Sequence, residues 1–153
     1  MFVSKKTIFF SVLSVILSAL TLLVMSPGWK AHTIFYYMTS VVFLPAAYIL
    51  ISSLLSGLMA KDDLPRLLAV HIGAAVVISL VISLGTHFLL TEETLNTIIS
   101  NTESLETAGE LNVSKGGAGD IIQAVVCFIA LGGLGSLIGY KIGKKRRMAP
   151  KAY

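Results

Sequence analysis

The stretch LLAVHIGAAVVISLVISLGTHFLL, residues Leu67–Leu90, decides the fold, because its 24 residues include no Lys, Arg, Asp or Glu. A helix needs about 20 mainly apolar residues to cross a hydrocarbon core ~30 Å thick. Three further stretches of this kind lie at Thr7–Met25, Ile34–Met59 and Ile121–Tyr140. The sequence therefore predicts an all-α membrane protein with four transmembrane helices in an antiparallel bundle.

The composition supports a single membrane domain over residues 1–153. Hydrophobic residues make up 55% of the chain, charged residues only 13%, and the mean hydropathy is +0.84. A soluble domain has about 25% charged residues. The four spans leave only a loop at residues 91–119 and a basic tail at residues 141–153. The first span is preceded by Lys5 and Lys6, as in a signal peptide. It is longer than the 7–15 apolar residues typical of one, so we expect it to be retained.

The positions of the cations predict the orientation. Ten of the twelve Lys and Arg residues fall in the N-terminal segment, the linker after the second span and the tail. Cytoplasmic loops carry the excess of Lys and Arg, which predicts both termini in the cytoplasm and the loop at residues 91–119 outside, in a bacterial inner membrane. Because the cations gather at span ends, anionic lipid headgroups rather than nucleic acid are their expected partners. The strongest such cluster is Lys144, Lys145, Arg146 and Arg147.

Small residues recur along three of the spans at three- and four-residue spacing. In membranes, such faces allow close helix packing, as in the GxxxG motif. The predicted helix-packing residues are Ser11, Ser14 and Ser18 in the first span, Ala75, Ser79 and Ser83 in the third, and Gly135, Gly139 and Gly143 in the fourth. The pattern does not say whether these faces meet helices of this chain or of another.

Two other signals concern the spans and their connections. Pro45 lies inside the second span, where it frees a backbone carbonyl and predicts a kink. The linker at residues 60–66 is short, which predicts that spans two and three are neighbours. Asp62 or Asp63 could cap the third span.

The loop at residues 91–119 is the largest exposed element. Thr91 and the acids that follow it are typical of a helix start, and Leu95, Ile98, Ile99 and Leu105 have helix-like spacing. They predict a short amphipathic helix over 92–106 on the outer surface. A glycine-rich joint at 116–119 and a formal glycosylation sequon at Asn112 follow. Trp29, Tyr36 and Tyr37 are expected at the outer interface.

The sequence offers few residues that could take part in catalysis or bind a metal. His71 and His87 are the only imidazoles inside a span, and intramembrane polar residues are candidates for function. They are sixteen residues apart, roughly 24 Å along a helix, and cannot share a metal. His87 could instead approach His32 near the outer face. No charged residue lies inside a span, and Cys127 is the single cysteine. We therefore expect no enzyme activity, no metal site and no cofactor.

The leading functional hypothesis is a non-enzymatic accessory or assembly subunit of a membrane complex, acting through the small-residue faces and the outer loop. Its partner would be another membrane protein or a second copy of the chain. One alternative is a small transporter or channel subunit whose oligomer encloses a pore lined by the Ser/Thr face. Another is an immunity or regulatory protein that blocks a membrane-inserting partner.

Overall fold

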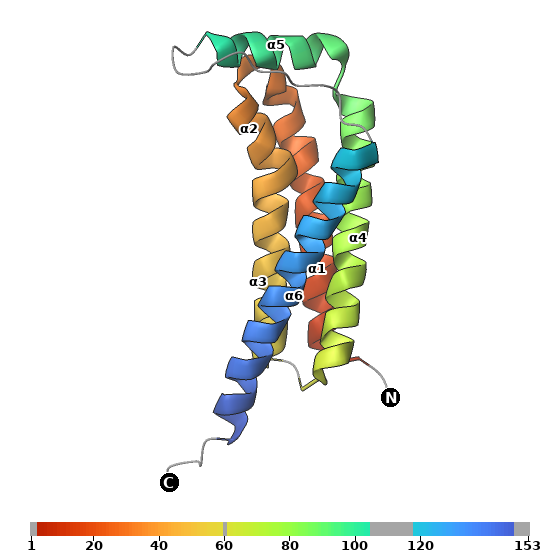
Figure 1. Ribbon diagram of the computed structural model, residues 1–153, viewed down its shortest axis with the longest axis vertical. Helices are drawn as coiled ribbons and strands as arrows, with labels where there is room; N and C mark the ends of the chain where they lie inside the picture. The colour runs from red at the N-terminus through yellow and green to blue at the C-terminus, as the bar shows by residue number, and fades with distance from the viewer. Residues whose placement is uncertain (1–2, 60, 105–117, 149–153) are drawn as a thin grey trace.

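The computed structural model describes residues 3–59, 61–104 and 118–148, and the chain is helical through nearly all of them. Four long helical segments run side by side, and a shorter helix lies across one end of them (Figure 1). Each of the four is long and apolar enough to span a membrane. They are α1 (Lys5–Met25), the segment Ile34–Met59, α4 (Leu64–Leu89) and α6 (Ala118–Met148).

The second segment is composite. It consists of α2 (Ile34–Met38), the π turn η2 (Thr39–Phe43) and α3 (Leu44–Met59). Pro45 has no N–H to donate to the carbonyl four residues earlier, and its ring crowds that carbonyl. The backbone widens into the π turn directly before this proline, with the Leu44 N–H bonded to the Thr39 carbonyl. The disturbance expected at Pro45 therefore takes the form of a π turn.

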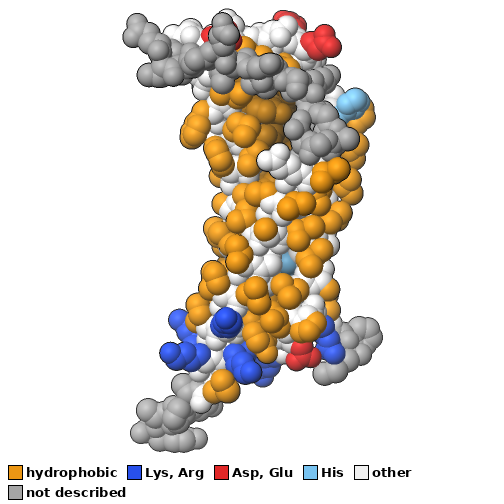
Figure 2. Space-filling view, viewed as in Figure 1, with side chains coloured by type: hydrophobic (Ala, Val, Ile, Leu, Met, Phe, Trp, Pro, Cys, Tyr) orange, Lys and Arg blue, Asp and Glu red, His pale blue; other side chains and the backbone are white. Residues whose placement is uncertain are grey.

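Two short elements complete the molecule, and they lie at the same end. The 3₁₀ helix η1 (Ser26–Ala31) follows α1, and α5 (Glu92–Glu103) follows α4. We call η1 and α5 together the α5 end. The opposite end holds the first turn of α1, the linker between α3 and α4, and the last turns of α6, and we call it the basic end (Figure 1). In Figure 2, hydrophobic side chains predominate on the visible face between the two ends.

The order of the helices around the bundle differs from the expectation for spans two and three. Helix α3 packs chiefly against α6 and α1, and α4 packs against the same two helices. Helices α3 and α4 contact each other much less, so they lie diagonally across the bundle. Four residues separate Met59 from Leu64. A chain this short can still extend roughly 13 Å, enough to join diagonal helices. A short linker therefore did not make its helices close neighbours.

Helix α6 continues beyond the predicted end of its span at Tyr140, through the cationic cluster to Met148. Lys145, Arg146 and Arg147 lie in its last turn, where positive charge interacts favourably with the helix dipole. The basic residues are thus carried on a helix rather than on an irregular tail. Residues 149–153 lie outside the described part.

The bundle interior combines apolar and small polar side chains. The buried apolar cluster comprises Leu22, Trp29, Val41, Ile49, Ala74, Ala75, Ile78, Ile82, Leu90, Leu95, Ile98 and Phe128. Among the described residues, the buried polar side chains are those of Ser and Thr together with His71. The aliphatic side chains at the outside of α1 and α6 are exposed, as expected for surfaces that face lipid.

Candidate functional site

The glycine row of α6 packs against α3. Gly135, Gly139 and Gly143 are all buried. A Cβ atom built on Gly139 would collide with the Leu54 carbonyl oxygen, and one on Gly143 would lie 2.6 Å from the Gly57 carbonyl oxygen. These obstacles are backbone atoms, which cannot rotate away as a side chain can. The row is therefore a face on which the two backbones meet directly.

Helix α3 contributes a glycine of its own to this contact. A Cβ on Gly57 would lie 2.5 Å from the Tyr140 nitrogen and 2.6 Å from the Gly139 carbonyl carbon. Gly57 and Gly139 therefore face each other across the α3–α6 contact. Sequence spacing identified the row on α6 but did not identify Gly57 of α3 as its partner. The partner of the glycine row is this chain's own α3.

The serine face of α1 also points into the bundle. Ser11, Ser14 and Ser18 are at most 5% exposed. The Ser14 hydroxyl donates to the Ser11 carbonyl and the Ser18 hydroxyl to the Ser14 carbonyl, both at 2.8 Å. These two hydroxyls satisfy themselves within α1, which allows a polar face to pack against α3 and α4. This face too is enclosed by the same chain.

The small residues of α4 divide between the interior and the boundary. Ala75 and Ser79 are buried, and the Ser79 hydroxyl donates to the Ala75 carbonyl at 2.9 Å. Ser83 is partly exposed. The predicted face therefore turns inward at its first two positions and reaches the edge of the bundle at the third.

His71 is fully buried between α4 and α6. Its Nδ1 lies 2.8 Å from the Leu67 carbonyl oxygen and 3.3 Å from the Ser136 hydroxyl. A carbonyl oxygen can only accept, so the Nδ1 atom carries the proton and donates to Leu67. The same atom cannot take a proton from Ser136. The Ser136–His71 pair therefore lacks the arrangement of a serine nucleophile with its base.

Three buried polar atoms have no hydrogen-bond partner among the described residues. They are the Ser11 hydroxyl of α1, the Ser56 hydroxyl of α3 and the Nε2 atom of His71 on α4. A buried polar group left unpaired costs about 1–3 kcal/mol. The sequence singled out His71, but it did not indicate that Ser56 would also be buried without a hydrogen-bond partner. Whether a side chain on one helix is buried depends on how the other helices pack against it.

The other two histidines are exposed and stack on aromatic neighbours. The His87 and Phe88 rings are 5.3 Å apart, and the His32 and Tyr36 rings are 4.3 Å apart. Among the described residues, no group of three or more His, Cys, Asp or Glu side chains could hold a metal ion. Cys127 is exposed on α6.

Asp62 makes the main polar link at the basic end. Its carboxylate accepts hydrogen bonds from the Ser4 N–H, at 2.9 and 3.1 Å, and from the Thr7 hydroxyl at 2.5 Å. It therefore caps the start of α1, a helix 55 or more positions away in sequence. Asp63 precedes α4 and bonds through its backbone carbonyl, with no side-chain cap. Asp63 is thus the N-cap residue of α4, one of the two predicted positions, but it accepts the hydrogen bonds there through its backbone carbonyl and not through its side chain.

The α5 end is held together by side chains from three segments. Trp29 is fully buried, and its indole N–H donates to the Ser40 hydroxyl at 3.0 Å. The sequence predicted this ring near the outer membrane interface; within the α5 end it is enclosed by protein, and Ser40 accepts the hydrogen bond of its N–H. Thr102 of α5 accepts the Ile34 N–H at 2.8 Å, and so caps the start of the second segment.

Two further contacts tie α5 to the α1–α2 connection. The Asn101 amide donates to the carbonyls of Lys30 and His32, both at 3.2 Å. The Lys30 ammonium lies 3.1 Å from the Glu93 carboxylate. Leu95 and Ile98 are buried beneath the helix. Their helix-like spacing was visible in the sequence, whereas the roles of Asn101 and Thr102 depend on contacts about 70 positions away.

The remaining face of α5 is polar and exposed. It presents Glu92, Asn96, Ser100 and Glu103. Leu105 and Glu106, the last residues of the predicted helix, lie outside the described residues, as do the sequon at Asn112 and the first glycines of the joint at 116–119.

The cationic cluster lies at the opposite end. Lys144, Lys145, Arg146 and Arg147 are exposed on α6 beyond its contact with α3. They lie next to Gly143, the last glycine of the row.

Comparison with known proteins found no match to this chain among protein-family models, curated proteins or solved structures.

Proposed function

We propose that this chain is a non-enzymatic membrane subunit that contacts its partner through the exposed face of α5. One observation carries the proposal: the small-residue faces of α1 and α6, and most of that of α4, are filled by helices of the same chain. Gly139 meets the backbone of α3, and Ser18 is fully buried. These faces are unavailable to another protein, so the partner surface shifts to the end of the bundle.

The proposed orientation places the basic end in the cytoplasm and the α5 end outside a bacterial inner membrane. Lys and Arg side chains gather at the basic end, and the α5 end shows acidic ones (Figure 2). Cytoplasmic segments of membrane proteins carry the excess of cations. An apolar zone of four helices separates the two ends, and its length suits a bilayer core.

The buried hydroxyls support a structural rather than a catalytic role. Those of Ser14, Ser18 and Ser79 donate to carbonyls of their own helices. The His71 Nδ1–H donates to a carbonyl as well. None of these groups is paired as a nucleophile and a base, which is the arrangement that an activated serine needs. The serine face of α1 points inward, so it does not favour an oligomeric pore lined by that face.

The α5 face suits a partner because it is fixed and polar. Its hydrogen bonds and the Lys30–Glu93 ion pair hold α5 on the bundle, so little flexibility is lost on binding. Glu92 and Glu103 give the face a negative character that favours a basic or polar segment of another membrane protein outside the membrane.

Photo-crosslinking in intact cells tests the proposal. We would place a photoreactive residue at Asn96 or Ser100, which are exposed on α5, and compare it with one at Val126, which is 60% exposed on the lipid-facing side of α6. We expect one reproducible protein adduct from both α5 positions and none at Val126, and the adduct formed from Ser100 should be lost when Asn96 is replaced by Arg. Equal adducts at all three positions, or none, would contradict the proposal.

Reporter fusions test the orientation separately. A reporter after residue 153 should be cytoplasmic, and one inserted near residue 108 should be extracytoplasmic. The opposite result at either position would overturn the assignment, whatever the crosslinking shows.

A further inference from the structure

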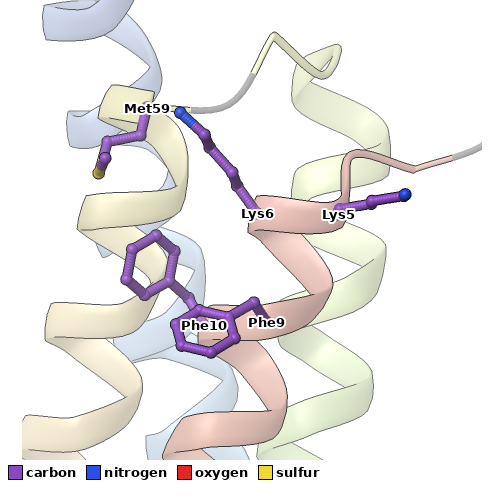
Figure 3. Close-up of a pocket in the computed structure, with 5 residues that line it drawn as sticks. All are labelled: Lys5, Lys6, Phe9, Phe10 and Met59. Carbon is purple, nitrogen blue, oxygen red and sulfur yellow. The ribbon is translucent and has the colours of Figure 1, made fainter.

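A shallow groove of about 360 Å³ lies between α1 and α3 at the basic end. It is lined by Lys5, Lys6, Phe9 and Phe10 of α1 and by Met59 of α3 (Figure 3). The groove is open rather than enclosed. The groove has cations at its end and apolar side chains along its length.

The apolar part is formed by two phenyl rings and a thioether. The rings of Phe9 and Phe10 meet edge to face with centroids 5.5 Å apart. Phe9 is 61% exposed and Met59 is 50% exposed. Phenylalanine rings offer apolar surface with no group that needs a hydrogen bond, and the flexible methionine side chain fits irregular apolar ligands.

The charged part is provided mainly by Lys6. In Figure 3 the Lys6 side chain extends toward Met59, whereas that of Lys5 points away. In the described part of the chain, neither ammonium group forms an ion pair with a carboxylate. Lys6 can therefore bind an anion at the end of the groove.

The nearby carboxylate of Asp62 does not occupy this face of α1. It bonds to the Ser4 N–H and to the Thr7 hydroxyl. Thr7 is buried, and Lys6 is rotated from it by about 100° around the helix. The negative charge is thus directed to the bundle side of α1, and the positive charge of Lys6 to the groove side.

We propose that this groove binds one anionic phospholipid. The lipid phosphate pairs with the Lys6 ammonium, and an acyl chain lies over Phe9, Phe10 and Met59. The charge at the groove end selects an anionic headgroup. The exposed apolar lining beneath it selects a hydrocarbon chain, which is what surrounds this part of a membrane-spanning bundle. The proposal goes beyond the role of α5 and requires only that the four helices lie in a bilayer.

Lipid titration of the purified full-length chain tests the site. The protein is delipidated in mild detergent and titrated with phosphatidylglycerol or phosphatidylcholine, and bound lipid is counted by native mass spectrometry. We expect one phosphatidylglycerol to bind more tightly than any phosphatidylcholine. Lys6→Gln should weaken that binding roughly fivefold, the factor that corresponds to about 1 kcal/mol for a lysine near an anionic lipid surface.

Two matched variants show whether the effect belongs to the groove. Lys6→Arg keeps the charge and should bind as the unchanged chain does, within about twofold. Lys144→Gln removes a cation from the same end but outside the groove, and it should also stay within about twofold. Lys6 and Lys144 are exposed, so none of these changes disturbs the core. Equal affinity for the two lipids, an unaffected Lys6→Gln variant, or an equal loss in Lys144→Gln would each overturn the proposal.

Discussion

Helices α1 and α6 occupy opposite corners of the bundle, and both turn small residues inward, but different interactions hold them. At α6, three glycines bring its backbone against that of α3, so the contact depends on the absence of side chains. At α1, the serine side chains remain in the contact, and the hydroxyls of Ser14 and Ser18 donate to carbonyls of the same helix. A carboxylate then ties the start of α1 to the linker. Similar spacing in the sequence thus produces two kinds of packing. The contact of α6 does not tolerate added side-chain atoms, whereas the serine face of α1 tolerates the removal of a hydroxyl.

The largest effect is expected at the centre of the glycine row. Gly139→Ala places a methyl group against the Leu54 carbonyl and the Gly57 backbone. Overpacking of this kind costs typically ~1–3 kcal/mol, and Gly139→Leu should cost more. The measurement is folded yield in mild detergent together with reversible unfolding in a denaturing detergent.

Leu137→Ile is the control for that change, because Leu137 is 37% exposed and its replacement stays apolar. Both variants should insert into the membrane equally well. Similar recovery of Gly139→Leu and Leu137→Ile would show that the glycine row does not bear the packing.

The next effect concerns the polar anchor of α1. Asp62→Ala removes the acceptor of the Ser4 N–H and of the Thr7 hydroxyl. Hydrogen bonds to charged groups contribute about 1.5–3 kcal/mol, so the variant should lose stability within this range. Asp63→Ala should change it by less than about 0.5 kcal/mol, since the Asp63 side chain is 68% exposed and makes only a long ion pair. Equal losses in the same unfolding assay would show that Asp62 has no special role.

A smaller effect of opposite sign is expected at Gly73 of α4. A Cβ atom at this position would meet no atom within 4 Å. Gly73→Ala should therefore stabilise the helix by roughly 0.5–1 kcal/mol, through its better helix propensity. If it destabilised the bundle as much as Gly139→Ala, the cost at Gly139 would come from lost glycine flexibility rather than from close packing.

The smallest effect is expected on the serine face. The Ser18 hydroxyl donates to the Ser14 carbonyl within α1. Its removal leaves no donor of a neighbouring helix unpaired, so Ser18→Ala should change the unfolding free energy by less than about 0.5 kcal/mol. A loss above about 1 kcal/mol would mean that the hydroxyl holds α1 to its neighbours, and the contrast with α6 would fail.

Sequence analysis predicted the four membrane-compatible helices because their length and composition follow directly from the thickness of a bilayer core. Helix pairing could not be obtained in this way. The spacing of Gly135 and Gly139 marks a close contact, yet nothing in it selects α3 as the partner. Residues 60–63 are long enough to join diagonal helices as readily as adjacent ones, so the linker did not fix the order around the bundle.

The polar contacts were harder still to predict. Asp62 stands before α4 in the sequence and caps α1 in space. The Thr102 hydroxyl accepts a hydrogen bond from the Ile34 N–H, 68 positions earlier in the sequence, and so caps the start of the second segment. Trp29 is a residue type that is common at membrane interfaces. Here protein encloses its ring, and the Ser40 hydroxyl accepts the hydrogen bond of its indole N–H. Each outcome depends on which segments meet, and local patterns carry no such information.

The π turn at Thr39–Phe43 determines how the two halves of the second segment are rotated relative to each other. A π turn accommodates one more residue than an α-helix of the same rise, so it changes the rotational phase of everything beyond it by about 100°. On one side of the turn, Gly57 sets the phase by meeting α6. On the other side, Tyr37 sets it by meeting the Trp29 ring edge to face, with ring centroids 5.1 Å apart. Deleting one residue here would restore a regular helix but put its two halves out of phase, so that only one of the two contacts could form.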